Sequence, residues 1–340
     1  MYKSTSLIQF GLTKQALCGS RRTAKLSIRA SVNEKQELPF RLIKRGKVRD
    51  LYESDDQIIS VTTNRQSAFD RVITHVPFKG QVLNMTAAWW FFKTEHIVRN
   101  ALLSVPHPNV SIMRKLEVFP VEVIVRGYIT GTTNTSLWTI YEQGDREYCG
   151  NILPEGLVKN EELAFPIITP TTKGDVDVPI SGVEIVERGY MTKEQWRYVS
   201  NVALKLFHHG QYEAMKRGLI LVDTKYEFGH DDMGRIYLVD EMHTPDSSRY
   251  WLLESYEERF KRGEEPEYID KEFLRLWFKN NCDPYNDEVL PEAPKNLIQE
   301  LSERYIRLFE TITGEEFVRT DWETKDLIES IQAYLDSSKK

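Results

Sequence analysis

The stretch from Leu219 to Trp251 constrains the fold of this chain more than any other segment. It contains the runs LILVDTKYEFG and IYLVDEMHTPDSSRYW, which are apolar and rich in β-branched residues, and the short polar segment HDDMGR joins them. Two such runs around a short loop with glycines at both ends predict a β-hairpin. Together with the other predicted strands, this hairpin favours antiparallel sheets over regular β-α-β units.

Acidic residues recur along both strands of the predicted hairpin. Because side chains alternate along a strand, we expect Asp223, Lys225 and Glu227 on one face. The loop length allows a register in which Asp223 lies opposite Asp240. Like charges opposite one another destabilise a sheet, so a divalent metal beside Lys225 is expected to neutralise the three carboxylates. The alternative is an ordinary solvent-exposed face with alternating charge.

The exit of the second strand suits an anionic ligand. Pro245 ends the strand pairing, Asp246 and Ser248 are turn formers, and Arg249 follows them. An arginine on a turn beside carboxylates can bind a carboxylate or phosphate group through both arms of its guanidinium.

The segments LVDTKYEFG and LVDEMHTPDSSRYW resemble the two signature segments of the SAICAR synthetases, which are ligases of purine biosynthesis. The resemblance extends from about Leu42 to about Phe317. It implies an α+β fold with two lobes, related to the ATP-grasp enzymes, and an ATP cleft between the lobes. The corresponding division is an N-terminal lobe at 34–120 with a phosphate-binding turn and a C-terminal lobe at 121–340 with the metal and substrate site.

The resemblance also implies a reaction. A SAICAR synthetase joins L-aspartate to a carboxylated aminoimidazole ribotide, and ATP is converted to ADP and phosphate through an acyl phosphate. The implied cofactors are ATP and Mg²⁺, and the implied partners are small molecules only. Matching positions assign Glu227 and Asp240 to the metal, Lys225 and Asp223 to catalysis, and Asp246, Ser248 and Arg249 to an anionic end of a substrate.

A basic turn precedes the hairpin in the segment RLIKRGKVRDLYE. Gly46 lets the backbone approach a ligand, and Arg45, Lys47 and Arg49 surround it with positive charge, which favours phosphate. The segment lacks a Walker A sequence, and a solvated basic turn is the alternative interpretation. The resemblance implies that Lys47 and Arg49 contact the phosphates of ATP.

Two further segments match the family near its substrate pocket. The segment NRQSAFD implies substrate roles for Ser67 and Asp70, although Asn64 stands where the family pattern has aspartate. Arg126 ends an apolar run, so its guanidinium needs a partner, and the following Gly and Thr loop supplies hydroxyls for an anion. The resemblance implies that Arg126 and Thr132 bind the imidazole ribotide.

Several helices are expected. One begins at about Asn84 and carries an aromatic cluster, Trp89 to Phe92, that should pack in the core. A second runs to residue 217 from a capping box formed by Thr192 and Gln195. Residues 252–310 are expected to be helical, with an apolar stripe facing the core.

Charge is distributed unevenly. Residues 1–33 carry six basic residues and no acid and are rich in Ser and Thr, which is typical of an organellar transit peptide. We expect a disordered plastid transit peptide there; the alternatives are mitochondrial import, or a basic tail on a cytoplasmic protein. The remaining chain carries 39 basic and 51 acidic residues, which argues against nucleic-acid binding. Apolar runs are too short for a membrane span, and the three cysteines have no metal-site spacing.

Two other functions fit part of the pattern. A small-molecule kinase would share the metal hairpin and the phosphate turn but would release a phosphorylated product. A noncatalytic nucleotide-binding protein would have lost one of the acids or arginines, and only Asn64 departs noticeably from the family pattern.

Overall fold

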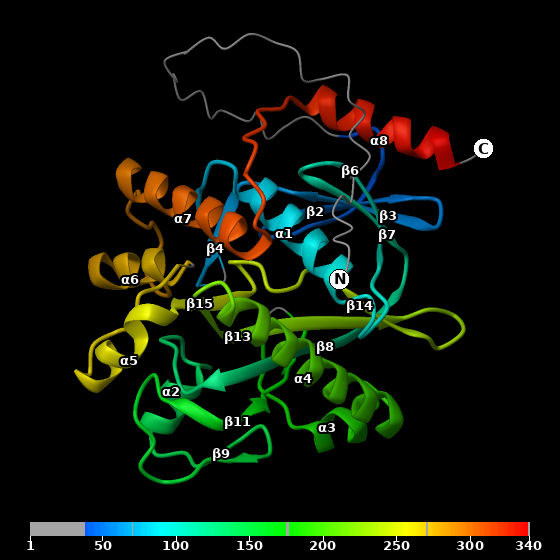
Figure 1. Cartoon of the computed structure of the whole chain (residues 1–340). Coiled ribbons are helices and arrows are strands. Elements are labelled where there is room, and N and C mark those ends of the chain that lie inside the picture. The colour runs from blue at the N-terminus through cyan, green and yellow to red at the C-terminus, as the bar shows by residue number, and fades with distance from the viewer. Residues whose placement is uncertain (1–37, 70, 175–176, 270, 339–340) are drawn as a thin grey trace, which may run out of the picture. The chain divides into compact units, whose positions relative to one another are not determined.

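The two longest strands of the protein lie side by side in one antiparallel sheet. The structure is a computed structural model that describes residues 38–69, 71–174, 177–269 and 271–338; the predicted transit segment and Asp70 lie outside the described residues. In Figure 1, β13 (Leu219–His230) pairs with β8 (Glu117–Tyr128). The sheet continues as β11 (Glu162–Ile168), β8, β13 and β14 (Ile236–Val239), while β12 (Thr171–Thr172) pairs with β8 and β15 (Ser248–Leu252) pairs with β13.

A second large antiparallel sheet precedes it in the sequence. Its order is β1 (Arg41–Arg45), β2 (Arg49–Ser54), β3 (Gln57–Thr62), β7 (Val110–Arg114) and β6 (Leu102–His107). Two small sheets pair β4 (Arg65–Ala68) with β5 (Arg71–His75), and β9 (Glu147–Tyr148) with β10 (Asn151–Ile152). The backbone at 99–101 bonds to Leu238 of β14, which ties the first large sheet to the second.

Helices pack against these sheets, which confirms the predicted α+β class. They are α1 (Lys79–Lys93), α2 (Leu137–Glu142), α3 (Gly182–Glu187), α4 (Lys193–Met215), α5 (Leu253–Lys261), α6 (Glu272–Asn281), α7 (Lys295–Thr313) and α8 (Thr324–Ser338). Among the described residues, no helix has both the length and the apolar character that crossing a membrane requires.

Helix α4 covers one face of β13 and β8 (Figure 1). The predicted capping box is confirmed, because Thr192 Oγ1 accepts from the Gln195 N–H at 3.1 Å and Gln195 Oε1 accepts from the Thr192 N–H at 2.7 Å. The helix buries Leu206 and Phe207 against the sheet. Alternate residues of β8 face the same core, and they are Val121, Val123 and Val125.

Helix α1 begins earlier than the predicted Asn84. Its N-terminal turn includes Gly80, whose N–H donates to Asn64 Oδ1 at 3.0 Å. A Cβ atom at Gly80 would lie 2.4 Å from the carbonyl oxygen of Thr62, so only glycine fits there. The capping group comes from a distant turn, which is why the local sequence does not mark this helix start. Trp89 to Phe91 are buried as predicted, whereas Phe92 is exposed.

Residues 252–310 form three helices rather than a continuous helical region. Prolines occupy the segments between α5, α6 and α7, where they cannot continue a helix, and they are Pro266, Pro284, Pro291 and Pro294. The predicted apolar stripe lies on α7 and is confirmed, because Leu301, Tyr305, Leu308 and Phe309 are buried.

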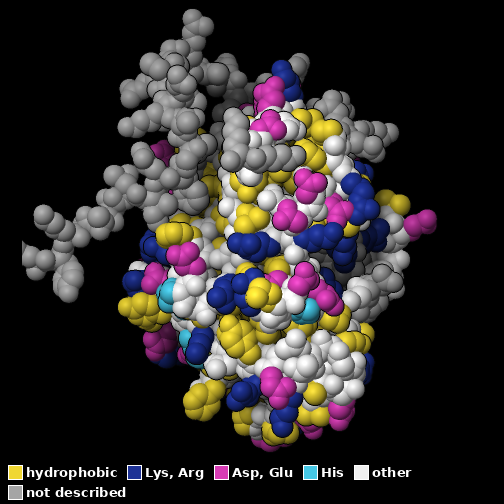
Figure 2. All heavy atoms as spheres, turned by 90° about the vertical axis from the view of Figure 1, so that its right-hand side faces the viewer, with side chains coloured by type: hydrophobic (Ala, Val, Ile, Leu, Met, Phe, Trp, Pro, Cys, Tyr) yellow, Lys and Arg dark blue, Asp and Glu magenta, His cyan; other side chains and the backbone are white. Residues whose placement is uncertain are grey.

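Positive and negative side chains lie next to one another across the face shown in Figure 2. A cavity of about 530 Å³ lies where the β13–β14 turn meets the first large sheet, and none of the predicted site residues lines it. Its lining includes Arg114, Lys115 and Arg235 together with Glu117 and Asp231. Because opposite charges line it together, its charge does not select a class of ligand.

Asn64 accepts a hydrogen bond at the start of α1, so we interpret it as a capping residue and not as the loss of a functional aspartate. We expect Asn64→Ala to lower the free energy of unfolding by about 1 kcal/mol, because the Gly80 N–H loses its acceptor. Asn64→Asp should keep the stability of the parent, since a carboxylate also accepts this bond near a helix N-terminus. Urea unfolding of the three proteins checks this, and equal stability of the alanine and parent proteins would contradict it.

Candidate active site

Strand β13 carries the predicted catalytic side chains and lies between β8 and the strands β14 and β15. Asp223, Lys225 and Glu227 alternate along it, as the sequence predicts. The predicted register is wrong, because Glu227 pairs with Val239 while Asp223 pairs with arginines of β8 and β15. Asp240 follows the end of β14 with a φ of +63° and does not lie opposite Asp223. The loop between the strands is therefore shorter than predicted.

Lys225 is the centre of the carboxylate cluster. Its ammonium lies 2.9 Å from Glu122 Oε1, 2.5 Å from Glu227 Oε1 and 3.7 Å from Asp240 Oδ2. The second carboxylate oxygen of Glu227 accepts from Lys173. Glu122 pairs directly opposite Glu227 on the neighbouring strand, so the repulsion expected from the sequence is present, with lysines neutralising it. The contacts of Glu122 and Lys173 with this cluster were not predicted, because nothing in their local sequence shows that they meet Lys225 or Glu227.

Burial and charge act in opposite directions on these groups. Burial alone would lower the pKa of Lys225, but Glu227 and Glu122 outweigh it and raise that pKa well above its usual value. Burial would raise the pKa of Glu227, but Lys225 and Lys173 hold it far below its usual range. For Asp240, burial prevails and raises the pKa. The lysine therefore stays charged at neutral pH and Glu227 stays ionised.

The predicted metal ligands Glu227 and Asp240 both contact Lys225. The described part of the chain contains no group of three His, Cys, Asp or Glu side chains that could hold a metal by themselves. Mg²⁺ commonly takes only one or two protein carboxylates and completes its shell with water and substrate phosphates. The side chain of Asp240 is 27% exposed and suits a metal that arrives with a phosphate-bearing substrate, whereas both carboxylate oxygens of Glu227 are bonded to lysines and would have to exchange one of them for the metal.

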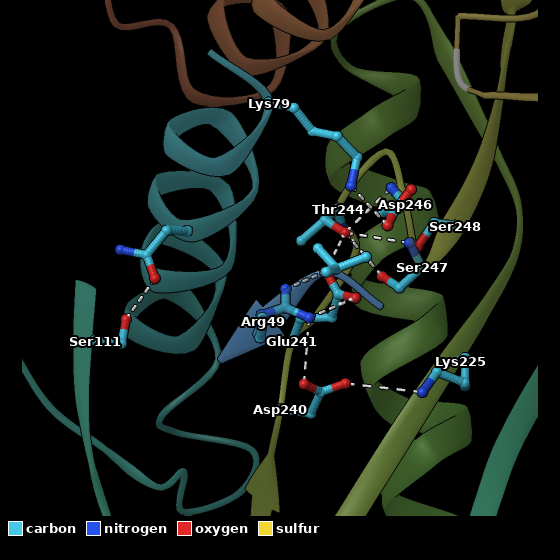
Figure 3. Close-up of polar contacts among 12 residues, drawn as sticks. Arg49, Lys79, Ser111, Lys225, Asp240, Glu241, Thr244, Asp246, Ser247 and Ser248 are labelled. Atoms are coloured by element: carbon cyan, nitrogen blue, oxygen red, sulfur yellow. Dashed lines mark hydrogen bonds and ion pairs between the residues drawn. The ribbon is translucent and has the colours of Figure 1, made fainter. Parts of the chain in front are cut away.

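The basic turn meets this cluster through Arg49 (Figure 3). The Arg49 guanidinium donates to both carboxylate oxygens of Glu241, at 3.1 and 2.7 Å, and to Asp240 Oδ1 at 3.3 Å. These carboxylates outweigh the effect of burial and raise the pKa of Arg49. Arg65 supports the turn by donating to the Gly46 carbonyl at 3.0 Å. Arg49 therefore joins the two large sheets, while Lys47 lies on the exposed side of the turn.

Asp223 holds the two predicted substrate arginines together. Its Oδ2 accepts from Arg249 Nη1 at 2.6 Å and lies 3.9 Å from Arg126 Nη1. Arg126 also donates from Nε to Thr169 Oγ1 at 2.7 Å, which gives its buried guanidinium the partners that the sequence required. Burial lowers the pKa of Arg126 although Asp223 opposes that effect. The site therefore presents two adjacent guanidinium groups.

Glu272 extends this arginine cluster. It accepts from Thr132 Oγ1 at 2.6 Å and lies 3.8 Å from Arg249 Nε. Burial alone would raise the pKa of Glu272, but Arg249 and Arg275 lower it to about 2. Thr132 and Arg249 thereby share Glu272 as a partner, an arrangement that the sequence did not predict. Glu272 itself was not predicted, because an acid at the start of a helix has no distinctive sequence signal.

Asp246 lies in a buried ion-pair cluster (Figure 3). Its side chain is 5% exposed and accepts from Lys79 at 3.1 Å, while Lys271 lies 3.2 Å away. Burial lowers the pKa of Lys79 to about 8, and the negative charge of Asp246 offsets only part of this shift. Tyr305 from α7 adds a bond of 3.4 Å to Asp246.

The remaining predicted substrate residues lie apart from the arginines or are buried. Ser248 is buried and its hydroxyl lies 2.8 Å from Thr224 Oγ1. Ser67 lies half-buried in β4, opposite Val72 of β5. The structure thus brings together Asp223, Arg126, Thr132 and Arg249, and separately Arg49, Lys225, Glu227 and Asp240.

Comparison with known proteins gives consistent results. The family model described as SAICAR synthetase matches residues 42–292. The phosphoribosylaminoimidazole-succinocarboxamide synthase of Legionella pneumophila (strain Lens) is 62% identical over 282 residues, which covers 83% of this chain and 90% of that protein. The chloroplastic synthase of Arabidopsis thaliana is 61% identical over 271 residues, covering 79% of this chain and 66% of that protein. A SAICAR synthase structure from Saccharomyces cerevisiae, complexed with SAICAR, matches with a TM-score of 0.72 and 34% identity and covers 83% of this chain and 98% of its own.

Loss of the buried Lys79 ammonium should strongly reduce the stability of the folded protein. We expect Lys79→Met to lower the free energy of unfolding by about 3 kcal/mol, because Asp246 would lose one of its two lysine partners inside the protein. The matched control is Lys115→Met, since Lys115 pairs with Glu53 but its side chain is 55% exposed. That change should cost less than about 1 kcal/mol. Equal losses in urea unfolding would show that burial does not set the cost.

Proposed function

The chain belongs to the SAICAR synthetase family, and we propose that the side chains around Lys225 carry out the family's reaction in this protein. The protein is an ATP-dependent carbon–nitrogen ligase of purine biosynthesis, a phosphoribosylaminoimidazole-succinocarboxamide synthase. The observation that best supports the assignment is the contact of one partly exposed ammonium with three carboxylates. Phosphoryl transfer needs positioning and charge neutralisation more than covalent help from the protein.

The reaction proceeds in two steps. A carboxylate oxygen of the ribotide attacks the γ-phosphorus of ATP, and ADP leaves with the electrons of the broken bond. The aspartate amine then attacks the carbonyl carbon of this acyl phosphate, phosphate leaves, and an amide forms. The aspartate ammonium loses one proton before it attacks and a second as the amide forms, and these protons pass to water and to the phosphate oxygens. The first step is needed because a carboxylate oxygen leaves poorly until it carries phosphate.

Lys225 neutralises the transferred phosphoryl group. Its side chain is 26% exposed and stays charged, so it can contact the substrate oxygens that gain negative charge. Glu227 and Asp240 would hold Mg²⁺, which when bound neutralises the phosphate oxygens of ATP. Glu227 also keeps Lys225 in place through its bond of 2.5 Å.

The anionic end of the ribotide binds at the paired arginines. Arg126 and Arg249 are held side by side by Asp223, and Thr132 adds a hydroxyl near Arg249. A dianionic phosphate suits two adjacent guanidinium groups.

Two other predicted substrate residues, Asp246 and Ser248, act by holding Arg249 in place. They fix the start of β15, the strand that carries Arg249, because both are buried and bonded within the protein. The assignments of Ser67 and Asp70 to the substrate remain predictions from the family resemblance.

ATP binds between the two large sheets, with its phosphates under the basic turn. Lys47 is exposed and can reach a phosphate, whereas Arg49 is bonded to Asp240 and Glu241 and orders the turn beside them. The first sheet would then belong to the lobe at 34–120 and most of the second sheet to the lobe at 121–340. However, β8 begins at Glu117 and α8 packs against β6, so the predicted boundary cuts a strand and the first sheet also takes in a C-terminal helix.

Plastid import is part of the proposal. Residues 1–33 have the composition of a transit peptide, and the similar protein from Arabidopsis thaliana is chloroplastic by name. Fusion of residues 1–33 to a fluorescent protein tests this, and fluorescence spread through the cytoplasm of plant cells would contradict it.

Glu227→Gln should reduce turnover by at least about 100-fold, because a carboxylate that fixes Lys225 and would hold the metal is lost. The assay follows ADP release with ATP, Mg²⁺ and the carboxylated ribotide, with and without L-aspartate. Release by the parent protein should depend on aspartate and yield the succinocarboxamide. Glu117→Gln is the control, since the side chain of Glu117 is 80% exposed, and it should keep full activity. A stable phosphorylated product without aspartate would instead indicate a kinase.

Arg249→Lys should raise the KM for the ribotide by about 10-fold or more, because lysine cannot bind Asp223 and a phosphate group with the geometry of a guanidinium. The KM for ATP should change little, since the basic turn is a separate part of the site. Arg259→Lys, on α5, is the matched control and should leave both constants unchanged. An equal rise in both KM values would contradict the proposal that the ribotide and ATP bind at separate parts of the site.

A further inference from the structure

His243 belongs to the loop between β14 and β15 that carries Asp240, and its side chain is fully buried. Its backbone has a φ of +52°, in the left-handed region that non-glycine residues seldom adopt. The imidazole ring contacts the Trp90 ring of α1 at 4.7 Å between centroids. On α4, a Cβ atom at Gly210 would lie 2.3 Å from His243 Cε1, so the absence of a side chain there makes room for the imidazole.

The imidazole is bonded to the middle of the catalytic strand. Tyr226 stands between Lys225 and Glu227 on β13, and its side chain points to the opposite face of the sheet. Its hydroxyl lies 2.5 Å from His243 Nε2. Both side chains are completely buried. This bond connects the strand that carries Lys225 and Glu227 with the loop that carries Asp240, in addition to the Lys225–Asp240 contact and the Lys225 N–H bond to the Ser247 carbonyl at 3.1 Å.

The protonation states define the direction of this bond. Burial raises the pKa of Tyr226 well above its usual value, so the phenol keeps its proton. Burial, and then the nearby His209, lower the pKa of His243 to about 3, so the imidazole is neutral. The tyrosine hydroxyl donates to Nε2, and Nδ1 then carries the imidazole hydrogen. Nδ1 has no hydrogen-bond partner within the described part of the chain.

The loop needs such support because its backbone is strained at two places. Asp240 and His243 both have positive φ, and residues of this kind persist when their surroundings hold them. Tyr250 donates to the His243 carbonyl at 2.8 Å, and Thr94 lies 3.6 Å from the Met242 sulfur. The bond from Tyr226 comes from the strand of the catalytic lysine and reaches the strained part of the loop at His243, whereas the Lys225 N–H bonds further along the loop, at the Ser247 carbonyl.

We propose that the Tyr226–His243 hydrogen bond positions Asp240 and Glu241 relative to Lys225 and Glu227 and thereby supports the ligase reaction. The two residues act from behind the sheet and do not touch the substrate. The proposal rests on the function proposed above, because it assumes that Lys225 and Glu227 act in the reaction.

Tyr226→Phe tests the bond with the smallest change, since only the hydroxyl is removed. We expect kcat to fall by about 10- to 100-fold, because a small misplacement of reacting groups is enough for such a loss. The KM for the ribotide should stay within about 2-fold of the parent value, since its arginines belong to another part of the site. Tyr141→Phe is the matched control: that hydroxyl is also in a buried residue and bonds to the Pro154 carbonyl at 2.9 Å. The control should keep the parent kcat.

Two substitutions at His243 distinguish a role in positioning the catalytic groups from a role in folding alone. Gln can place an acceptor near the position of Nε2, whereas Leu fills the space without one. We expect His243→Gln to keep most of the kcat and His243→Leu to lose as much as Tyr226→Phe. The double variant Tyr226→Phe/His243→Leu should be no slower than either single variant, because each removes the same bond.

All rates are measured below the thermal unfolding midpoint of each variant. Parent kcat in Tyr226→Phe, with a lowered midpoint, would overturn the proposal and leave the bond a purely structural one. Equal losses in the Gln and Leu variants of His243 would also overturn it. If Glu227→Gln is inactive but Tyr226→Phe is fully active, the inference fails and the proposed function stands. If Glu227→Gln is fully active, both fail, whatever Tyr226→Phe does.

Discussion

The shared contact of the Lys225 ammonium with Glu122, Glu227 and Asp240 is the interaction on which the site depends. Glu122 and Glu227 lie directly opposite each other on neighbouring strands, and this arrangement would be repulsive without the lysine between them. The lysine in turn keeps its charge only because the carboxylates outweigh the effect of burial. Each partner therefore needs the others, and Lys225 and Glu227 stay charged at the place where we propose that phosphoryl transfer occurs.

The loop that follows β14 connects this cluster to the rest of the protein. Glu241 binds Arg49 of the first sheet, and Asp246 binds Lys79 of α1. Within the loop, His243 packs between α1 and α4 and bonds to β13. Elements from both large sheets thus meet in one short segment, and a change in that segment is felt by the basic turn and the catalytic strand together.

The separation of the site into two charged groups matches the two kinds of anion that the ligase handles. The carboxylates around Lys225 suit a metal and the phosphates of ATP, whereas Arg126 and Arg249 suit the anionic end of the ribotide. Asp223 and Lys225 belong to different groups although they are two residues apart on one strand. One strand face therefore contributes to both charged groups from adjacent positions.

The sequence by itself determined the family, the α+β class, and which residues of β13 share a face, because strand alternation depends only on neighbours in the chain. It also indicated the basic turn and the arginines. Only the tertiary structure decided the partners: Arg49 and Glu241 lie 192 residues apart, and Asp240 does not face Asp223 as the predicted register required. Likewise, Asn64 caps α1 from a separate turn, and Glu122, Lys173 and Glu272 join the site without a local signal. Such pairings depend on how distant elements pack, which local patterns of residues do not encode.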